Sequence, residues 1–268
     1  MKYLFLVYVM IFIVIYLIEE NIIHIDINYI NYKIKNNMKY RLDNPKYTKF
    51  VDKLQFKEYC KSKGVDTIKT LKIYEQKDYD NINFNELPYK FILKSNKASG
   101  RNFIIKKNIK KKSLNGIVNK CPNSYIKLRN DISGWGDIYR LQEPQYEHTK
   151  PKIFSEELIE PNPINIRLYY LNYKLKLIIV YVNNIKVLYD ENKNRLNIQG
   201  DMKEYNGKTV LDNMSNDKFK ELISISDKLA SDLDLDFFTV DIYYINNKFY
   251  GGEITLSPDR GNTKFNYI

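Results

Sequence analysis

Residues 237–261 read FFTVDIYYINNKFYGGEITLSPDRG, and this segment decides the fold. Apolar and polar side chains alternate over Val240–Ile245, and an extended pattern resumes over Phe249–Leu256, as expected of two β-strands. Asn246 and Asn247 lie between them and suit a tight turn, because asparagine tolerates a positive φ. The segment therefore predicts a β-hairpin.

Two acidic residues lie inside the predicted strands, Asp241 in the first and Glu253 in the second. An ionised carboxylate within a strand is unfavourable unless a counter-charge compensates it. If the strands pair across the turn, the two carboxylates approach each other and could share a divalent cation. Mg²⁺ suits such a site because it takes hard oxygen ligands and leaves positions for phosphate. The alternative is a hairpin whose two acids simply face solvent, and their spacing leaves both interpretations open.

Composition points to a folded, basic protein. The 268 residues, 44% of them hydrophobic, are enough for one large domain or two smaller lobes. A net charge of +11 favours anionic partners. However, Asn, Lys, Ile and Tyr are abundant throughout, as an AT-rich genome would produce, and no nucleic-acid-binding motif accompanies the charge. Nucleic acid is therefore not an expected partner. Cys60 and Cys121 lack the spacing of a metal site and are expected to be free thiols.

The N-terminus carries an unbroken apolar run, Tyr3–Ile18, between Lys2 and the pair Glu19 and Glu20. As a helix it is somewhat shorter than the ~30 Å hydrocarbon core of a bilayer. It lacks the small residues of a signal-peptide cleavage site. We predict an uncleaved single-pass membrane anchor over residues 1–20; the alternative is a buried core helix.

Lysine and arginine residues follow the apolar run, which favours a cytosolic body by the positive-inside rule. Residues 21–50 are polar and basic and are expected to form a tether. Beyond the tether, hydrophobic periodicity predicts helices at 53–62 and 219–233 and strands at 66–74, 91–93, 152–159, 166–170 and 175–181. This mixture indicates an α+β fold with antiparallel sheets.

Lys94 follows one of these short strands and precedes a small polar loop, residues 95–100. A lysine in this position can reach phosphate, and free backbone N–H groups of the loop can cradle it. A solvated loop lysine is the commoner case, so this motif is weak on its own.

Five segments taken together are more specific than any one of them. They are DKLQFKEYCKSKGV (52–65), LPYKFILKSNKASG (87–100), KPKIFSEELI (150–159), INIRLYYLNYKLK (164–176) and TVDIYYINNKFYGGEITLSP (239–258). Their order resembles that of an ATP-grasp enzyme and, more narrowly, of the teichuronopeptide-biosynthesis, TupA-like family. The resemblance covers approximately residues 50–265.

The resemblance implies an ATP-grasp fold in which two α+β lobes, within residues 51–160 and 161–268, enclose ATP. It assigns roles to individual positions of this chain. Phosphate-binding positions are Lys53, Lys94 and Arg167, with Lys94 and Arg167 also catalytic; the phosphate-covering loop includes Lys97, Ser99 and Gly100; adenine meets Glu156, Glu157, Leu158 and Ile159; and the Mg²⁺ ligands are Asp241, Glu253 and Thr255.

The activity implied by the resemblance is ATP-dependent joining of a carboxylate to an amine through an acyl-phosphate. The substrates are unknown and are expected to be linked to a glycan or cell-surface polysaccharide. Thr239 stands where relatives usually carry an arginine that steadies the oxyanion, Asn165 replaces an acid, and Lys97-Ala98 replaces His-Gly. Weakened activity is therefore an open alternative. So are a non-catalytic nucleotide-binding module and a glycosyltransferase-like role in polysaccharide synthesis.

Overall fold

The structure is a computed structural model, and it describes a defined part of the chain. The described residues are 32, 44–75, 86–97, 102–106, 146, 148–150, 152–183, 185–196, 198–199, 205–258 and 265–267. Within these ranges the helices are η2 (Pro45–Tyr47), α2 (Thr48–Val51), α3 (Lys53–Ser62), α6 (Val210–Asn213) and α7 (Asn216–Ala230). The strands are β1 (Thr70–Tyr74), β2 (Lys90–Ser95), β3 (Asn102–Lys106), β4 (Ile153–Glu157), β5 (Ile164–Leu171), β6 (Lys174–Val182), β7 (Ile185–Tyr189), β8 (Ile198–Gln199), β9 (Phe237–Ile245), β10 (Lys248–Thr255) and β11 (Asn266–Tyr267).

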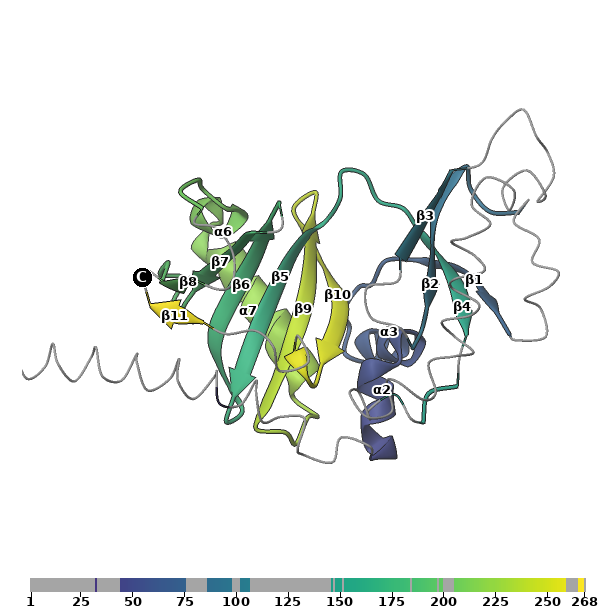
Figure 1. Ribbon diagram of the computed structural model, residues 1–268, viewed down its shortest axis with the longest axis horizontal. Coiled ribbons are helices and arrows are strands. Elements are labelled where there is room, and N and C mark those ends of the chain that lie inside the picture. The colour runs from purple at the N-terminus through teal and green to yellow at the C-terminus, as the bar shows by residue number, and fades with distance from the viewer. Residues whose placement is uncertain are drawn as a thin grey trace, which may run out of the picture.

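The strands form two main antiparallel sheets that lie on opposite sides of α2 and α3 (Figure 1). One sheet has the order β1-β4-β2-β3, and the other has the order β10-β9-β5-β6-β7. A further pair, β8 and β11, lies beside β7 at the outer end of the five-stranded sheet. The predicted α+β class with antiparallel sheets is confirmed.

The hairpin predicted from residues 237–261 is present as β9 and β10. Asn246 and Asn247 form its turn with φ values of 48° and 62°, which is the left-handed region that asparagine tolerates. The pairing register places Glu253 opposite Asp241. Directly opposed residues of an antiparallel pair project from the same face of the sheet, so both acids share one face.

The five-stranded sheet buries its other face in the main hydrophobic core. Side chains of β5 and β9, such as Leu168, Val240 and Ile242, pack there with Leu222 and Leu229 of α7. Helix α7 crosses this face behind the strands in Figure 1. The predicted helix at 219–233 is confirmed with shifted ends. Its N-terminus is earlier because the hydroxyl of Ser215 caps it by accepting a hydrogen bond from the Lys218 N–H.

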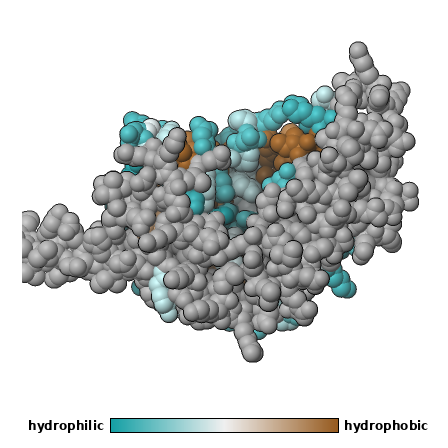
Figure 2. Space-filling view, in the orientation of Figure 1, coloured by the Kyte–Doolittle hydropathy of each residue, from teal (hydrophilic) through white to brown (hydrophobic). Residues whose placement is uncertain are grey.

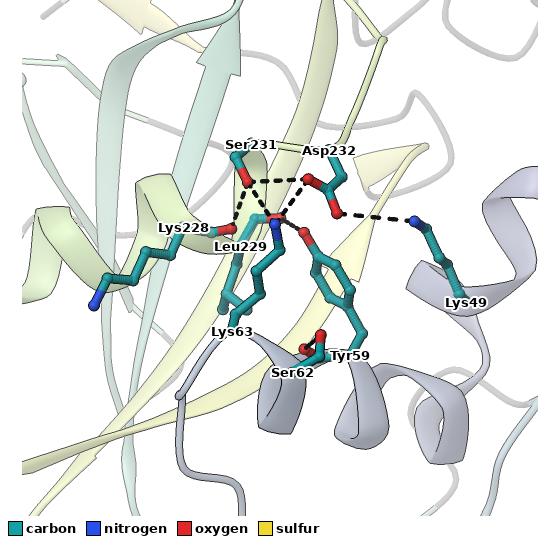
Figure 3. A network of polar contacts seen from close by, with 8 residues as sticks. All are labelled: Lys49, Tyr59, Ser62, Lys63, Lys228, Leu229, Ser231 and Asp232. Atoms are coloured by element: carbon teal, nitrogen blue, oxygen red, sulfur yellow. Dashed lines mark hydrogen bonds and ion pairs between the residues drawn. The ribbon is translucent and has the colours of Figure 1, made fainter.

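Helix α3 occupies the predicted residues and packs against the end of α7. Tyr59 is buried and donates a hydrogen bond from its hydroxyl to the Leu229 carbonyl at 3.1 Å. Around it, Lys63 pairs with Asp232 at 2.8 Å and donates to Ser231 at 3.0 Å, while Lys49 lies 3.9 Å from Asp232. Figure 3 shows this network between α2, α3 and the residues that follow α7. It ties the segment carrying α3 to the five-stranded sheet.

The N-terminal anchor predicted over residues 1–20 lies outside the described residues, as does most of the tether. Among the helices that the structure does describe, none has the length and apolar character needed to cross a membrane. The second predicted thiol, Cys121, is also outside the described ranges, whereas Cys60 is a free, buried cysteine as expected.

Candidate functional site

The polar face of the hairpin carries an ion cluster centred on Asp241. Arg167 of β5 is the cross-strand neighbour of Asp241 on one side, and Glu253 of β10 is its neighbour on the other. The Arg167 guanidinium donates to both oxygens of Asp241, from Nε to Oδ1 at 2.7 Å and from Nη2 to Oδ2 at 2.8 Å. The same Nη2 lies 3.9 Å from Glu253 Oε1. The two acids therefore meet around one guanidinium.

Burial makes this cluster sensitive to charge, since Asp241 is only 1% exposed. Burial raises the pKa of the Asp241 carboxyl, and the Arg167 guanidinium opposes that shift. Burial also disfavours the Arg167 cation, but Asp241 outweighs it and holds the pKa of the guanidinium above its ordinary value. Asn165 adds a long contact from Nδ2 to Asp241 Oδ2 at 3.4 Å. Arg167 is thus the main counter-charge of Asp241.

A second cation reaches this cluster from α3. Lys53 Nζ lies 3.8 Å from Glu253 Oε2. Its helix begins at Asp52, whose Oδ1 accepts hydrogen bonds from the Leu54 N–H at 2.9 Å and the Gln55 N–H at 3.2 Å. This is a side-chain N-cap, which satisfies two amides that the first helical turn would otherwise leave unpaired. The cap fixes Lys53 in the first turn beside the hairpin.

Two glycines let the hairpin come close to its neighbours. A Cβ on Gly252 would lie 2.9 Å from the Asp241 carbonyl oxygen and 3.1 Å from the Tyr243 ring. The pairing register shifts between Gly251 and Glu253, so a bulge lies directly before the second acid. A Cβ on Gly251 would lie 2.6 Å from Cys60 Sγ. The Gly251 N–H donates to the Asp66 carbonyl at 2.8 Å, which joins β10 to the segment after α3.

The four-stranded sheet contributes a second ion cluster, centred on Glu156 of β4. Glu156 Oε1 lies 2.5 Å from Lys57 Nζ, and Glu156 Oε2 accepts a hydrogen bond from Lys94 Nζ. Lys57 also donates to the Ile68 carbonyl oxygen. Glu156 and Lys94 are both buried. Two lysines from different elements therefore share one carboxylate.

Asn96 connects this second cluster to α3. Its side-chain amide donates to Asp52 Oδ2 at 2.8 Å. Its main-chain carbonyl oxygen accepts from the Lys53 N–H at 3.2 Å. Asn96 lies two residues after Lys94, just beyond the end of β2. The N-terminus of α3 is thereby fixed to the end of the strand that carries Lys94.

An apolar surface lies next to the Glu156 cluster. Ile92 of β2 faces Ile104 of β3 across the pair, and alternation along β2 places Ile92 on the same side of the sheet as Lys94. The Glu156 position is also opposite Ile92. Ile104 is 53% exposed. Figure 2 shows the surface hollowed between the two sheets, with hydrophilic residues at the base and a hydrophobic patch on the wall of the four-stranded sheet.

The paired acids have the donor set that Mg²⁺ requires. Mg²⁺ is commonly bound through one or two carboxylates, with waters and substrate phosphates completing its octahedron. Asp241 and Glu253 supply two carboxylates on one face. In the part of the chain that the structure describes, no cluster of three or more His, Cys, Asp or Glu residues is present. Both Asp241 oxygens accept from Arg167, so a metal bound here would share Asp241 with that guanidinium.

The predicted site residues lie around these clusters to different degrees. Lys53, Arg167, Asp241 and Glu253 come together in the first cluster, while Lys94 and Glu156 come together in the second. Glu157 is the last residue of β4, and Leu158 and Ile159 follow in the connection to β5. Thr255 lies opposite Thr239 on β9. Lys97 follows β2, whereas Ser99 and Gly100 are outside the described residues.

Several residues of the two clusters were not expected from the sequence. Lys57 is the main one, with Asp52 and Asn96 in supporting contacts. Tyr243 is another, since it lies two residues after Asp241 on the same face of β9. Burial, together with the Glu253 and Asp241 carboxylates, raises the pKa of Tyr243. For Lys57 the available signal was its place four residues after Lys53, because residues at that spacing share a helix face.

Comparison with solved structures gives remote matches. A D-alanine–D-alanine ligase from Helicobacter pylori is 16% identical with a TM-score of 0.46, and the match covers 79% of this chain and 52% of that one. The ATP complex of the corresponding Bacillus anthracis ligase is 13% identical with a TM-score of 0.47, covering 78% and 54%. An L-amino acid ligase from Bacillus licheniformis is 12% identical with a TM-score of 0.44, covering 78% and 44%.

The chain thus spans about half the length of the solved ligases that it matches. No curated protein sequence matches it. The sequence profile described as TupA-like ATPgrasp matches residues 32–267, which is most of the chain. This chain therefore belongs to the TupA-like ATP-grasp family.

Proposed function

We propose that this chain is an ATP- and Mg²⁺-dependent ligase that joins a carboxylate to an amine. In the proposed reaction a substrate carboxylate oxygen attacks the γ-phosphorus of ATP, which forms an acyl-phosphate and releases ADP. The amine then attacks the acyl carbon, phosphate leaves, and the amine nitrogen loses a proton. Membership of the ATP-grasp family supports this reaction class.

One observation carries the proposal: two acids share one face of a hairpin, and cations from other elements reach both. Asp241 and Glu253 would hold Mg²⁺, which when bound supplies positive charge to the phosphates. Lys53 and Arg167 reach the same two acids and would bind the phosphoryl oxygens. Lys94 would bind phosphate from the opposite sheet. Preorganised positive charge of this kind stabilises the charge that develops in phosphoryl transfer.

The base of the nucleotide would lie on the wall of the four-stranded sheet. Ile92 and Ile104 offer an apolar surface there, and Glu156 lies on the same side of the sheet. An exposed isoleucine beside buried charged groups suits a flat, apolar ring that also carries hydrogen-bonding edges. Leu158 and Ile159, in the connection to β5, would complete the contact with adenine.

The carboxylate or amine substrate is proposed to be part of a glycan or a cell-surface polysaccharide. The net charge of +11 suits an acidic polymer. We further propose that residues 1–20 anchor the chain in a membrane as a single pass, with the body in the cytosol. Deletion of residues 1–20 should move the protein from the membrane fraction to the supernatant. A full-length chain that is already in the supernatant would contradict the anchor.

The site is tested by removing the two acids. Asp241→Asn with Glu253→Gln should abolish the Mg²⁺-dependent part of ATP binding in titration calorimetry. A charge-matched control is Asp217→Asn with Glu221→Gln, because both residues are exposed on α7. The control should bind as the parent does. A double variant that binds Mg²⁺-ATP as tightly as the parent would refute the assignment.

A second candidate function is a nucleotide-binding module without turnover. Thr239 favours it, because this residue stands where relatives usually carry an arginine. Its side chain is fully buried, and within the described ranges its hydroxyl has no hydrogen-bond partner. Such a module would bind Mg²⁺-ATP through the same acids but release no ADP with any carboxylate and amine offered. The ligase predicts ADP release that depends on both substrates.

A further inference from the structure

Lys57 is a half-buried cation that the proposed chemistry leaves without a role. It reaches Glu156 at 2.5 Å and also donates to the Ile68 carbonyl. Burial lowers its pKa, and Glu156 opposes that shift. The two contacts restrict the side chain of Lys57, which costs conformational entropy. The fixed position of Lys57 therefore suggests a role other than that of a solvated surface charge.

Charge balance in the Glu156 cluster suggests that explanation. Glu156 carries one negative charge and contacts two ammonium groups, those of Lys57 and Lys94. The cluster therefore has a net charge of +1. Without Lys57, Glu156 and Lys94 would form a neutral pair. Coulomb interactions are stronger at the lower effective dielectric of a protein than in water, so this difference is large for an anionic ligand nearby.

Helix α3 delivers this charge to a defined place. Lys53 and Lys57 are separated by four residues and so lie on one side of the helix. Lys53 reaches Glu253 of the five-stranded sheet, and Lys57 reaches Glu156 of the four-stranded sheet. The α3 N-terminus is held by Asp52 and Asn96, beside the end of the strand that carries Lys94. The net charge is thus fixed next to the hollow between the sheets.

We propose that Lys57 is a positioning residue that preserves the phosphate-binding charge of Lys94 by taking one oxygen of Glu156. It acts through Glu156 and Lys94, and it selects for ligands that carry phosphoryl groups over those that carry only the base and ribose. The inference rests on the proposed nucleotide site and deepens it. It differs from a purely structural role, which would alter all ligands of the site alike.

The test compares ATP, ADP and adenosine in titration calorimetry with excess Mg²⁺, using the full chain. Lys57→Met should weaken ATP binding by about tenfold or more, while adenosine binding changes by less than about twofold. Lys57→Arg should keep most of the ATP affinity because it keeps the charge. Lys61→Met is the matched control, since Lys61 is exposed one turn further along α3, and its ATP affinity should match the parent.

A second variant that changes the net charge of the cluster in the opposite direction separates an electrostatic effect from misfolding. Glu156→Gln raises the net charge of the cluster, so ATP should gain affinity relative to adenosine. Equal losses of ATP and adenosine in Lys57→Met would overturn the inference, and so would an unchanged ATP affinity. If the parent binds no nucleotide at all, the proposed function fails. If the parent binds ATP but the ATP-to-adenosine ratio moves in neither variant, only this inference fails.

Discussion

Replacement of Arg167 should lower the stability of the protein, because Asp241 would lose its counter-charge. Arg167→Met keeps much of the side-chain length but deletes the guanidinium that donates to both oxygens of Asp241, at 2.7 and 2.8 Å. Asp241 is 1% exposed, so water does not replace the lost contacts. Breaking a buried ion pair by removing one partner typically costs about 3–5 kcal/mol, because the remaining charge stays buried and uncompensated. The long Asn165 contact, at 3.4 Å, offsets only part of this.

We therefore expect Arg167→Met to lower the free energy of unfolding by about 3 kcal/mol at pH 7. Urea unfolding followed by circular dichroism measures this difference. Lys72→Met is the control, because Lys72 forms an exposed ion pair with Glu86 at 2.7 Å. Exposed pairs contribute at most about 1 kcal/mol. A loss for Arg167→Met no larger than that of the control would refute the account of Asp241 as a charge that needs its partner.

The pH dependence of this loss has a definite sign. Burial already raises the pKa of Asp241, and Arg167 opposes the shift. Without Arg167 the folded-state pKa rises further above the ordinary value of about 3.9. The penalty is then full above the folded pKa and shrinks as pH falls through it, because a protonated Asp241 needs no counter-charge. A penalty that stays constant or grows towards low pH would contradict this reasoning.

The same variant provides a metal test that needs no activity. In Arg167→Met, millimolar Mg²⁺ should restore part of the stability, since a ligand that binds only the folded state adds about 2.7 kcal/mol at 100 times its Kd. In Arg167→Met with Asp241→Asn, Mg²⁺ should restore nothing, and the double variant should be more stable than the single variant without metal. A single variant that is indifferent to Mg²⁺ would argue against Asp241 as a ligand.

The remaining predictions concern contacts around the hairpin and the hollow. Gly251→Ala should cost about 1–3 kcal/mol of stability, because its Cβ would lie 2.6 Å from Cys60 Sγ; Cys60→Ala should relieve part of that cost in a urea-unfolding double-mutant cycle. The Cys60 thiol should react with alkylating reagents only on unfolding, since it is fully buried and burial raises its pKa to about 12. Ile104→Asn should weaken adenosine and ATP binding to a similar extent in calorimetry, whereas an unchanged adenosine affinity would contradict Ile104 as part of the base-binding wall.

The sequence allowed prediction of features whose signals are local. The hairpin follows from alternation and from the pair Asn246-Asn247. The opposition of Asp241 and Glu253 also needs the local bulge between Gly251 and Glu253, because the two-residue turn alone would place Gly252 opposite Asp241. The limits of α3 follow from a short periodic segment between Asp52 and the chain turn at Gly64. Each of these features depends on residues close together in the chain, so propensity and pattern were sufficient.

The partners of the charged groups could not be predicted in this way. Arg167 and Asp241 are 74 residues apart, and Lys57 is separated from Glu156 by most of the first lobe. Their contacts depend on which strands pair and in which register, and no local motif encodes that. The resemblance to a family implied that Arg167 lies near phosphate, whereas the structure pairs its guanidinium with both carboxylate oxygens of Asp241. The ion pairs of the site therefore depend on how the strands pair in the folded chain.

Helix α3 is the element that relates the two ion clusters to each other. Its first turn sends Lys53 to Glu253 in one sheet, and its second turn sends Lys57 to Glu156 in the other. Its C-terminal end is held to α7, which packs on the five-stranded sheet, by the hydrogen bond from Tyr59 to the Leu229 carbonyl. Because one rigid helix carries both lysines, a shift of α3 changes both clusters together. The spacing of the two sheets is therefore set by α3 as much as by the strands that carry the acids.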